Sequence, residues 1–199
     1  MFPKQIQNFI EVFSKLPSIG PRMATRLAFY LAELDKNALN RYVVALSEIT
    51  GLGTCAHCFG ITEAEKTLCE ICGSTTRDKK TIAIVEKQTD VFTIEKASGY
   101  TGVYLILGEL KRDGTLEQEQ RKKLESLKKR IESDYAGHIT EIIIALGPNT
   151  FSDFVASVVK QAFKGMADRI TRIGRGLPTG GQVEFADEET LRSSFERRN

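Results

Sequence analysis

Residues 81–107 read TIAIVEKQTDVFTIEKASGYTGVYLIL, a stretch with the pattern of a strand, a helix and a second strand. The apolar runs at 81–86 and 102–107 are short and rich in β-branched and aromatic side chains, which predicts strands. The segment 89–97 between them is long enough for a helix and has a helical pattern. Because two strands that are joined through a helix normally run parallel, this stretch predicts an α/β fold with a parallel sheet.

The same alternation continues along the chain. A helix is expected at 116–134, a strand at 141–146, a helix at 152–163 and a strand at 169–173. The runs AIV and IIIA are apolar at successive residues, which is typical of strands that are covered by helices on both faces. We therefore expect one α/β domain with a mostly parallel sheet over residues 79–174.

The helix expected at 116–134 contains the longest run of charge. Its basic residues form triplets at 121–123 and 128–130, and glutamates lie among them at 117, 119, 125 and 132. Such interleaved charges can form pairs four residues apart, which favours a solvated outer face. We therefore do not assign this helix to DNA.

The chain begins with three expected helices. Apolar residues at 6, 9, 10 and 13 are spaced three and four apart, which predicts an amphipathic helix. A second helix is expected to start at Pro21, since proline suits the first helical turn, and a third covers 37–49. The glycines at 51 and 53 end this series. Residues 1–53 are thus a helical domain.

All four cysteines lie between the two domains, in two CxxC pairs. Cys55 and Cys58 form the first pair, Cys69 and Cys72 the second, and ten residues (59–68) separate them. Four thiolates in this arrangement can surround one Zn²⁺ tetrahedrally, and a closed four-ligand site is structural. We predict one structural zinc per chain, in a zinc-finger module at 54–78. Redox chemistry is the competing interpretation, and His57 is interpreted as a solvent-facing residue of the first pair.

The bulk composition limits the choice of partners. Lys and Arg exceed Asp and Glu by 28 to 26, so attraction to a polyanion must come from local clusters of basic residues. The N-terminus has no signal-peptide pattern, and no run approaches the roughly 18 apolar residues that a membrane span needs. Together with the cysteine pattern, this predicts a cytoplasmic protein with no membrane partner.

Residues 16–22 read LPSIGPR and resemble the hairpin of a helix-hairpin-helix, a DNA-binding motif without sequence specificity whose hairpin has the form LPGIG. A hairpin that contains Gly20 lets backbone amides at the start of the second helix approach a phosphate. Arg22 and Arg26, one turn apart, would add charged contacts. An ordinary helical hairpin is the equal alternative on these residues alone. Ser18 stands where the motif usually has glycine.

The order of these parts resembles the RecR family of bacterial recombination mediators over nearly the whole chain. The resemblance rests on the hairpin, the four cysteines, Arg77-Asp78, the Ile-Val-Glu strand and the C-terminal TRIGRGLPTGGQVEFADEETL. It implies a Rossmann-like Toprim domain at 79–174 and a ring-shaped homotetramer that encircles or holds DNA. It also implies work with RecO, and in many bacteria RecF, to load RecA onto single-stranded DNA coated by SSB. The implied role is that of a non-catalytic DNA clamp.

Toprim enzymes hold Mg²⁺ with a glutamate after the first strand and a carboxylate cluster after a later one. Glu86 matches the first position, whereas the segment 148–153, PNTFSD, leaves only Asp153 for the second. So few acids hold Mg²⁺ poorly, even if Asp90, four residues after Glu86, is added to them. We therefore interpret Glu86, Asp90 and Asp153 as a vestigial site without Mg²⁺. A Mg²⁺-dependent Toprim nuclease or primase that uses these three acids is the enzyme alternative.

Two further segments depart from simple expectations. The loop from Tyr104 to Gly114 carries Glu109 and Lys111-Arg112 where the family has glycine and a Ser-Pro pair, which affects a partner surface. A scaffold that has lost DNA binding is therefore another alternative. Residues 175–199 are interpreted as an oligomerisation tail, because their glycine-rich start lacks the GK[ST] ending of a phosphate loop. The arginines at 169, 172 and 175 are spaced three apart and need not share a strand face.

Overall fold

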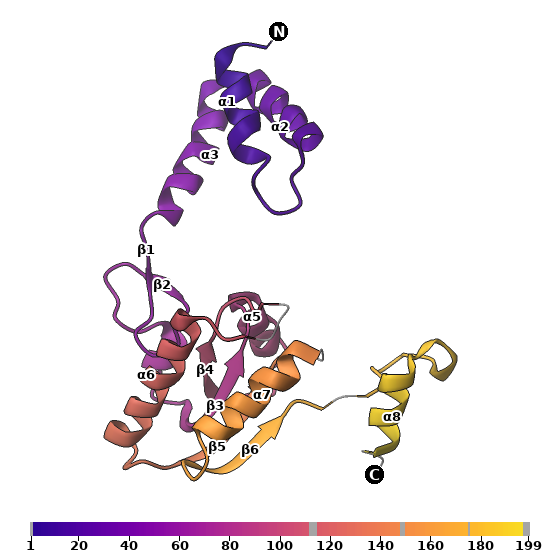
Figure 1. Ribbon diagram of the computed structural model, residues 1–199. Coiled ribbons are helices and arrows are strands. Elements are labelled where there is room, and N and C mark those ends of the chain that lie inside the picture. The colour runs from indigo at the N-terminus through magenta and orange to yellow at the C-terminus, as the bar shows by residue number, and fades with distance from the viewer. Residues whose placement is uncertain (1, 112–114, 148–149, 175, 197–199) are drawn as a thin grey trace. The chain divides into compact units, whose positions relative to one another are not determined.

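The computed structural model describes residues 2–111, 115–147, 150–174 and 176–196. The chain divides into two compact units, Met1–Leu52 and Gly53–Asn199 (Figure 1). The first unit holds α1 (Lys4–Phe13), α2 (Pro21–Glu33) and α3 (Lys36–Ile49). Proline at the first position of α2 and the Asp35 carboxylate, which accepts from the amides of Asn37 and Ala38, fix the starts of the second and third helices.

The helical unit has a very small interior. Among its described residues, only Ala24 and Ala28 of α2 are fully buried. Their small side chains, one turn apart, let α1 approach α2 closely. Many of the larger apolar side chains lie at the surface, including Val43, Leu46 and Ile49 of α3, each more than half exposed. A single copy of this unit therefore leaves most of its apolar surface in water.

The second unit is built on a four-stranded parallel sheet with the strand order β4-β3-β5-β6. Its strands are β3 (Asp78–Val85), β4 (Gly102–Ile106), β5 (Ile139–Ala145) and β6 (Ala167–Arg172). The connecting helices are α5 (Gln88–Lys96), α6 (Gln118–Asp134) and α7 (Thr150–Ala162). The predicted α/β architecture with a parallel sheet is confirmed.

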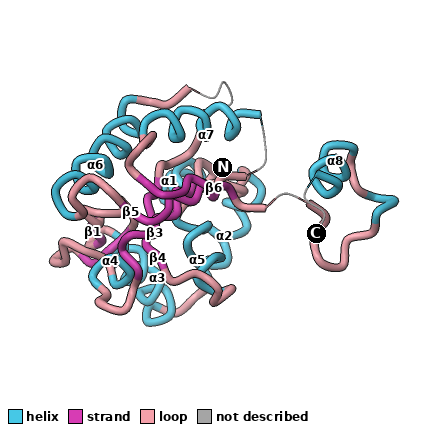
Figure 2. Tube along the Cα trace, turned by 90° about the horizontal axis from the view of Figure 1, so that it is seen from below, coloured by secondary structure: helices cyan, strands magenta, loops and turns pink. Residues whose placement is uncertain are grey.

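The two faces of the sheet have different covers. Ile82, Ile84 and Ile142 pack with α6 and α7 on one face, where Leu127 and Phe163 are also buried. Ala83 and Val85 point to the other face, toward Val91 of α5 and the cysteines. Figure 2 shows α6 and α7 on one side of the strands and α5 on the other. Both faces of the sheet are therefore covered, which explains why successive residues in the strands are apolar.

Two smaller parts complete this unit. A cysteine-bearing module contains β1 (Leu52–Thr54), β2 (Ile61–Glu63) and the short α4 (Glu70–Gly73), with β1 and β2 paired. The C-terminal segment contains a 3-10 turn, η1 (Val183–Phe185), and α8 (Glu188–Glu196). We did not predict α8 from the sequence. Within the described residues no helix combines the length and the apolar character that crossing a membrane requires.

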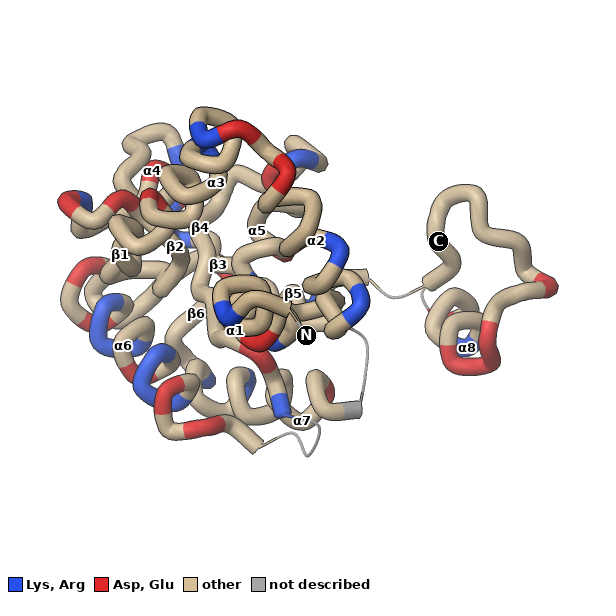
Figure 3. The backbone as a smooth tube through the Cα atoms, turned by 90° about the horizontal axis from the view of Figure 1, so that it is seen from above, with Lys and Arg blue, Asp and Glu red and all other residues tan. Residues whose placement is uncertain are grey.

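The expectation for α6 was only partly correct. Bands of Lys and Arg alternate with bands of Asp and Glu along this helix (Figure 3), and Glu119 pairs with Lys123 at 3.3 Å. The Lys123 side chain, however, is only 12% exposed. Its ammonium donates to the Leu107 carbonyl at 3.1 Å and lies over the Phe59 ring. Lys123 thus belongs to the interior side of α6 and not to its solvated face.

Candidate metal centre and helical hairpin

The four cysteines are presented by two tight turns. In the first, the Cys55 amide donates to the Gly60 carbonyl at 2.8 Å, and the Phe59 amide donates to the Cys55 carbonyl at 3.0 Å. Phe59 has a φ of 61°, a left-handed conformation that closes the turn. In the second, Cys69 precedes α4 and its sulfur accepts from the Cys72 amide at 3.5 Å. Both turns direct their sulfurs to one point.

The four sulfur atoms are positioned to bind a metal ion. All four lie within 4.8 Å of one another, and the Cys58 and Cys69 sulfurs are 3.6 Å apart. A tetrahedral zinc with bonds of about 2.3 Å needs sulfurs separated by about 3.8 Å. The donor set, four thiol groups on two CxxC turns, is the set that zinc prefers in structural sites. The site therefore fits a closed metal centre, as predicted from the cysteine spacing.

Burial makes this cluster unfavourable as four free thiolates. Cys55, Cys58 and Cys72 are buried and Cys69 is half-buried. Hydrogen bonding from neighbouring sulfurs lowers the pKa of Cys69, whereas the same contacts, together with burial, raise the pKa of Cys58 and Cys72. A bound cation would stabilise the thiolate form of these cysteines and so favour loss of their protons. Burial also lowers the pKa of His57, and the charges of Arg130 and Lys79 lower it further.

The metal centre is part of the sheet's packing. The Cys58 carbonyl accepts from the Ile106 amide of β4 at 2.9 Å. The three buried cysteines pack in one cluster with Val85 and Tyr104. Gly60 lies so close to its neighbours that an added Cβ would be 2.8 Å from the Ile106 side chain. The cysteine-bearing module and the α/β sheet therefore share one interior.

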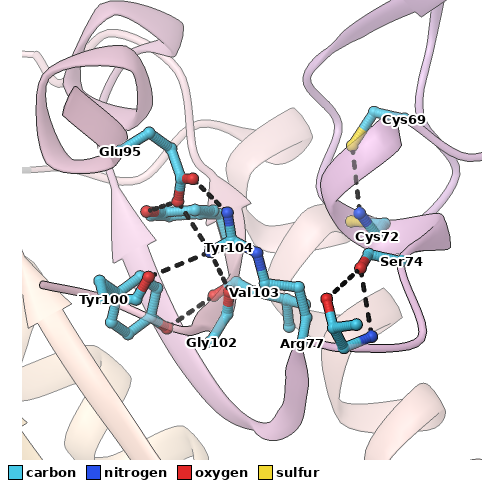
Figure 4. A network of polar contacts seen from close by, with 10 residues as sticks. Cys69, Cys72, Ser74, Arg77, Glu95, Tyr100, Gly102, Val103 and Tyr104 are labelled. Carbon is cyan, nitrogen blue, oxygen red and sulfur yellow. Dashed lines mark hydrogen bonds and ion pairs between the residues drawn. The ribbon is translucent and has the colours of Figure 1, made fainter. Parts of the chain in front are cut away.

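Arg77 joins the module to the sheet through a polar network (Figure 4). Its guanidinium forms a two-pronged ion pair with Glu95 of α5 and donates to the carbonyls of Tyr100 and Gly102 at 3.1 and 3.2 Å. The Tyr104 hydroxyl donates to the same Glu95 carboxylate at 2.5 Å. Arg77 holds the pKa of Glu95 below its usual range through this hydrogen bonding. Spacing in the sequence gave no signal for this pairing.

The hairpin of the helical unit has an open helix start. Gly20 precedes α2, no side chain caps the helix, and a Cβ on Gly20 would meet nothing within 4 Å. Arg22 and Arg26 are exposed and lie one turn apart on α2. Ser18 has a φ of 63°, in the left-handed region that favours glycine. The structure thus places Arg22 and Arg26 in the first two turns of the helix that Gly20 precedes.

Comparisons with known proteins cover almost the whole chain. A family model described as "RecR, helix-hairpin-helix" matches residues 6–50, a Toprim domain model matches 80–151, and a model described as "RecR, C-terminal" matches 176–199. Recombination protein RecR of Chloroflexus aurantiacus is 40% identical over 97% of this chain and 93% of its own length. The chain belongs to the RecR family. Recombination protein RecR of Paenarthrobacter aurescens is 34% identical over 100% of this chain and 98% of its own length.

The three acids that we interpreted as a vestigial Toprim site have separate partners. Glu86 accepts from the Leu110 amide at 3.2 Å and lies 3.9 Å from the Lys87 ammonium. Asp90 caps α5 by accepting from the Lys87 amide at 2.7 Å. Asp153, in the first turn of α7, forms an ion pair of 2.6 Å with Arg172. Among the described residues, the group that could hold a metal ion is the four cysteines.

The segments in which this chain departs from the family pattern lie partly within the described residues. From the sequence we expected the divergent loop to start at Tyr104. Tyr104 is instead buried in β4, and the loop begins after that strand. Glu109 lies 3.9 Å from Lys87, and Lys111 pairs with Glu117 at 2.6 Å. Residues 112–114, 148–149 and 175, and with them Arg112, Asn149 and Arg175, lie outside the described residues.

The C-terminal segment contains the helix α8, which we did not predict. The Asp187 carboxylate accepts from the Thr190 amide at 2.8 Å and starts α8, a capping pattern that the sequence could have revealed. The Ser194 hydroxyl of α8 accepts from the Leu177 amide at 3.0 Å, which folds the segment onto itself. Arg169 pairs with Glu141 at 3.2 Å, whereas Arg172 pairs with Asp153. The two arginines therefore have separate partners.

Proposed function

We propose that this protein is a non-catalytic recombination mediator in DNA repair that binds DNA without sequence specificity. In this proposal it helps RecO, and RecF where that protein is present, to load RecA onto SSB-coated single-stranded DNA. The observation that carries the DNA-binding step is the uncapped start of α2 at Gly20, with exposed Arg22 and Arg26 beside it. Free amides at a helix start and two guanidinium groups are a phosphate-binding arrangement. Membership of the RecR family supports the recombination step.

The proposed cofactor is one structural Zn²⁺ per chain, held by Cys55, Cys58, Cys69 and Cys72. The four-sulfur donor set and its spacing support zinc over magnesium, which prefers oxygen ligands. A zinc bound there would neutralise part of the thiolate charge and tie the two CxxC turns together. Reduced cysteines are needed for this site, which supports a cytoplasmic location.

A non-catalytic role is supported by the arrangement of the Toprim acids. Glu86, Asp90 and Asp153 each bind a partner within the protein, and two of these partners are the cations Lys87 and Arg172. A divalent metal would have to compete with these two cations for Glu86 and Asp153. The enzyme alternative predicts Mg²⁺-dependent cleavage or primer synthesis that is lost in Glu86→Ala, and a protein that shows this activity would contradict our proposal.

We further propose a homo-oligomer, most simply the tetramer of the family. The exposed apolar side chains of α3, together with Val183 and Phe185 of the tail, support two separate contact surfaces between copies. In this proposal the four segments have distinct tasks. Residues 1–53 bind DNA and another copy, 54–78 bind zinc, 79–174 form the Toprim body, and 175–199 contact a neighbouring copy.

The proposal is tested by fluorescence anisotropy with labelled DNA across a salt series. Arg22→Ala/Arg26→Ala should weaken binding and make the salt dependence shallower by about 0.7 to 0.9 per lost phosphate contact. The matched control is Lys36→Ala/Arg41→Ala, which removes the same charge from exposed positions on α3. The control should keep nearly all of the affinity, because its residues are away from the start of α2.

Two outcomes would count against this function. If the wild-type oligomer binds no DNA at low salt but still binds RecO, the protein is a scaffold that has lost DNA binding. If both double variants lose affinity equally, the attraction is a general charge effect and the hairpin has no special part in it.

A further inference from the structure

Two cations lie beside the cysteine cluster without an acidic partner. Arg130 of α6 and Lys79 of β3 line a small cavity together with Cys72 and Tyr135. Both cations are only partly exposed. The Arg130 Nε atom is fully buried and has no hydrogen-bond partner among the described residues. A buried N–H donor without a partner is unfavourable, so the position of this guanidinium needs an explanation.

Two acidic side chains on the same elements, Asp78 of β3 and Asp134 of α6, have other hydrogen-bond partners. The Asp78 carboxylate accepts from the Lys80 amide and the Thr81 hydroxyl, at 2.9 and 2.6 Å. The Asp134 carboxylate accepts from the Ser133 hydroxyl at 2.7 Å. In the described part of the chain, no ion pair within 4.0 Å joins Arg130 or Lys79 to a carboxylate. The missing negative charge must therefore come from elsewhere.

The metal centre can supply that charge when it is loaded. Four thiolates around one divalent cation leave a net charge of minus two on the centre. Two protein cations on one side of it would balance this charge in a region partly shielded from water, where electrostatic attraction is stronger than in bulk solvent. An anion such as a DNA phosphate is a poorer occupant. The cavity has a volume of about 10 Å³, room for one water, and the loaded centre would repel a second negative charge.

We propose that Arg130 and Lys79 are the outer counter-charges of the tetrathiolate metal centre and strengthen its hold on the metal. This inference rests on the proposed zinc site. It gives a function to two basic residues outside the cysteine module, one at the start of β3 and one near the end of α6. Residues that surround a metal's direct ligands commonly change metal affinity by 10- to 100-fold.

The test is zinc transfer from the full-length protein to a colorimetric chelator, measured as a rate and as an equilibrium competition. Arg130→Met, which keeps the aliphatic packing and removes the charge, should weaken zinc binding by about tenfold or more. Lys79→Met should weaken it by a smaller factor. Arg130→Lys should stay close to the wild type. Lys129→Met is the matched control, because Lys129 is an exposed neighbour on the same helix, and it should leave zinc binding unchanged.

A second measurement separates a counter-charge from a packing role. Zinc should raise the melting temperature of the wild type more than that of Arg130→Met. If Arg130 had only a packing role, Arg130→Met would melt below the wild type by the same amount with and without zinc. Equal zinc retention in wild type, Arg130→Met and Lys79→Met would overturn the inference and leave the zinc site standing. If Arg130→Met does not fold, Lys79→Met decides by itself. A wild type that binds no zinc would overturn the proposed metal and this inference together.

Discussion

The two compact units bury their apolar side chains to very different extents. In the helical unit only two alanines are fully buried among the described residues, and the large apolar side chains of α3 face outward. In the second unit a continuous core extends from Ile82 to Phe163, and a cluster of cysteines lies on the other face of the sheet. Burial of apolar area is the main stabilising contribution in folded domains. In our proposal the helical unit gains this burial from another copy, whereas the second unit gains it internally and is further stabilised by the proposed metal.

Metal removal should have the largest effect, and it should change the stability of the second unit alone. Chelation or Cys72→Ser should loosen the second unit, because structural zinc contributes on the order of 10 kcal/mol in small zinc modules. Hydrogen exchange should show lost protection in β4, α5 and the residues around the cysteines. The helices α1 to α3 should exchange as before. Unchanged protection in the metal-free protein would show that the sheet does not depend on the metal.

A charge on the exposed face of α3 should have the next largest effect. Leu46→Asp and Ile49→Asp should each weaken association between copies by roughly 10- to 100-fold, since burial of one such side chain contributes about 1.5 to 3 kcal/mol. Light scattering over a dilution series measures this directly. Ser47→Asp adds the same charge at an exposed polar position and should leave the oligomer intact. An oligomer that persists in all three variants would mean that α3 is not a contact surface.

Arg77→Ala should destabilise the second unit by about 1 to 3 kcal/mol in denaturant unfolding. The change removes the ion pair of Glu95 and the donor of two carbonyls, and both charged side chains are mostly buried, at 20% and 27% exposed. Lys80→Ala, at an exposed position on the same strand, should have little effect. If both variants unfold alike, the network that joins the module to the sheet contributes nothing measurable.

The same pair gives a prediction for acidic pH. Arg77 lowers the pKa of Glu95 in the folded state, so its stabilisation is complete above the unfolded glutamate pKa of about 4.3 and is lost as pH falls through the lower folded pKa. The difference in unfolding free energy between wild type and Arg77→Ala should therefore shrink below about pH 4.3. A difference that stays constant down to pH 2 would contradict this linkage.

The smallest expected change is a gain of stability in the helical unit. Ser18→Gly should stabilise the hairpin by about 0.5 to 1 kcal/mol, because Ser18 has a left-handed φ that glycine adopts without strain. Ser14→Gly is the control, since Ser14 has a right-handed helical conformation and glycine there should be neutral or unfavourable. Thermal unfolding of the two variants gives the comparison, and equal shifts would exclude strain at Ser18.

The parts of the structure with a regular sequence period could be predicted. Apolar spacing located the strands and helices of the α/β unit within a few residues, and the two CxxC pairs located the metal-binding cluster. Both signals are local. The pairing of Arg77 with Glu95 joins residues 18 positions apart and follows no period, so only the folded chain reveals it. Lys123 was expected in water, but its ammonium finds the Leu107 carbonyl and the Phe59 ring.

The order of strands in the sheet has one more consequence, for solubility. β4 is an edge strand, and edge strands present unpaired backbone groups that can recruit other chains. Here the Gly102 carbonyl accepts from Arg77, and the Ile106 amide donates to the Cys58 carbonyl. The cysteine-bearing module thus shields the edge of β4 at both ends. We expect the metal-free protein to aggregate through this uncovered edge, so that loss of the proposed metal would lower the amount of soluble protein.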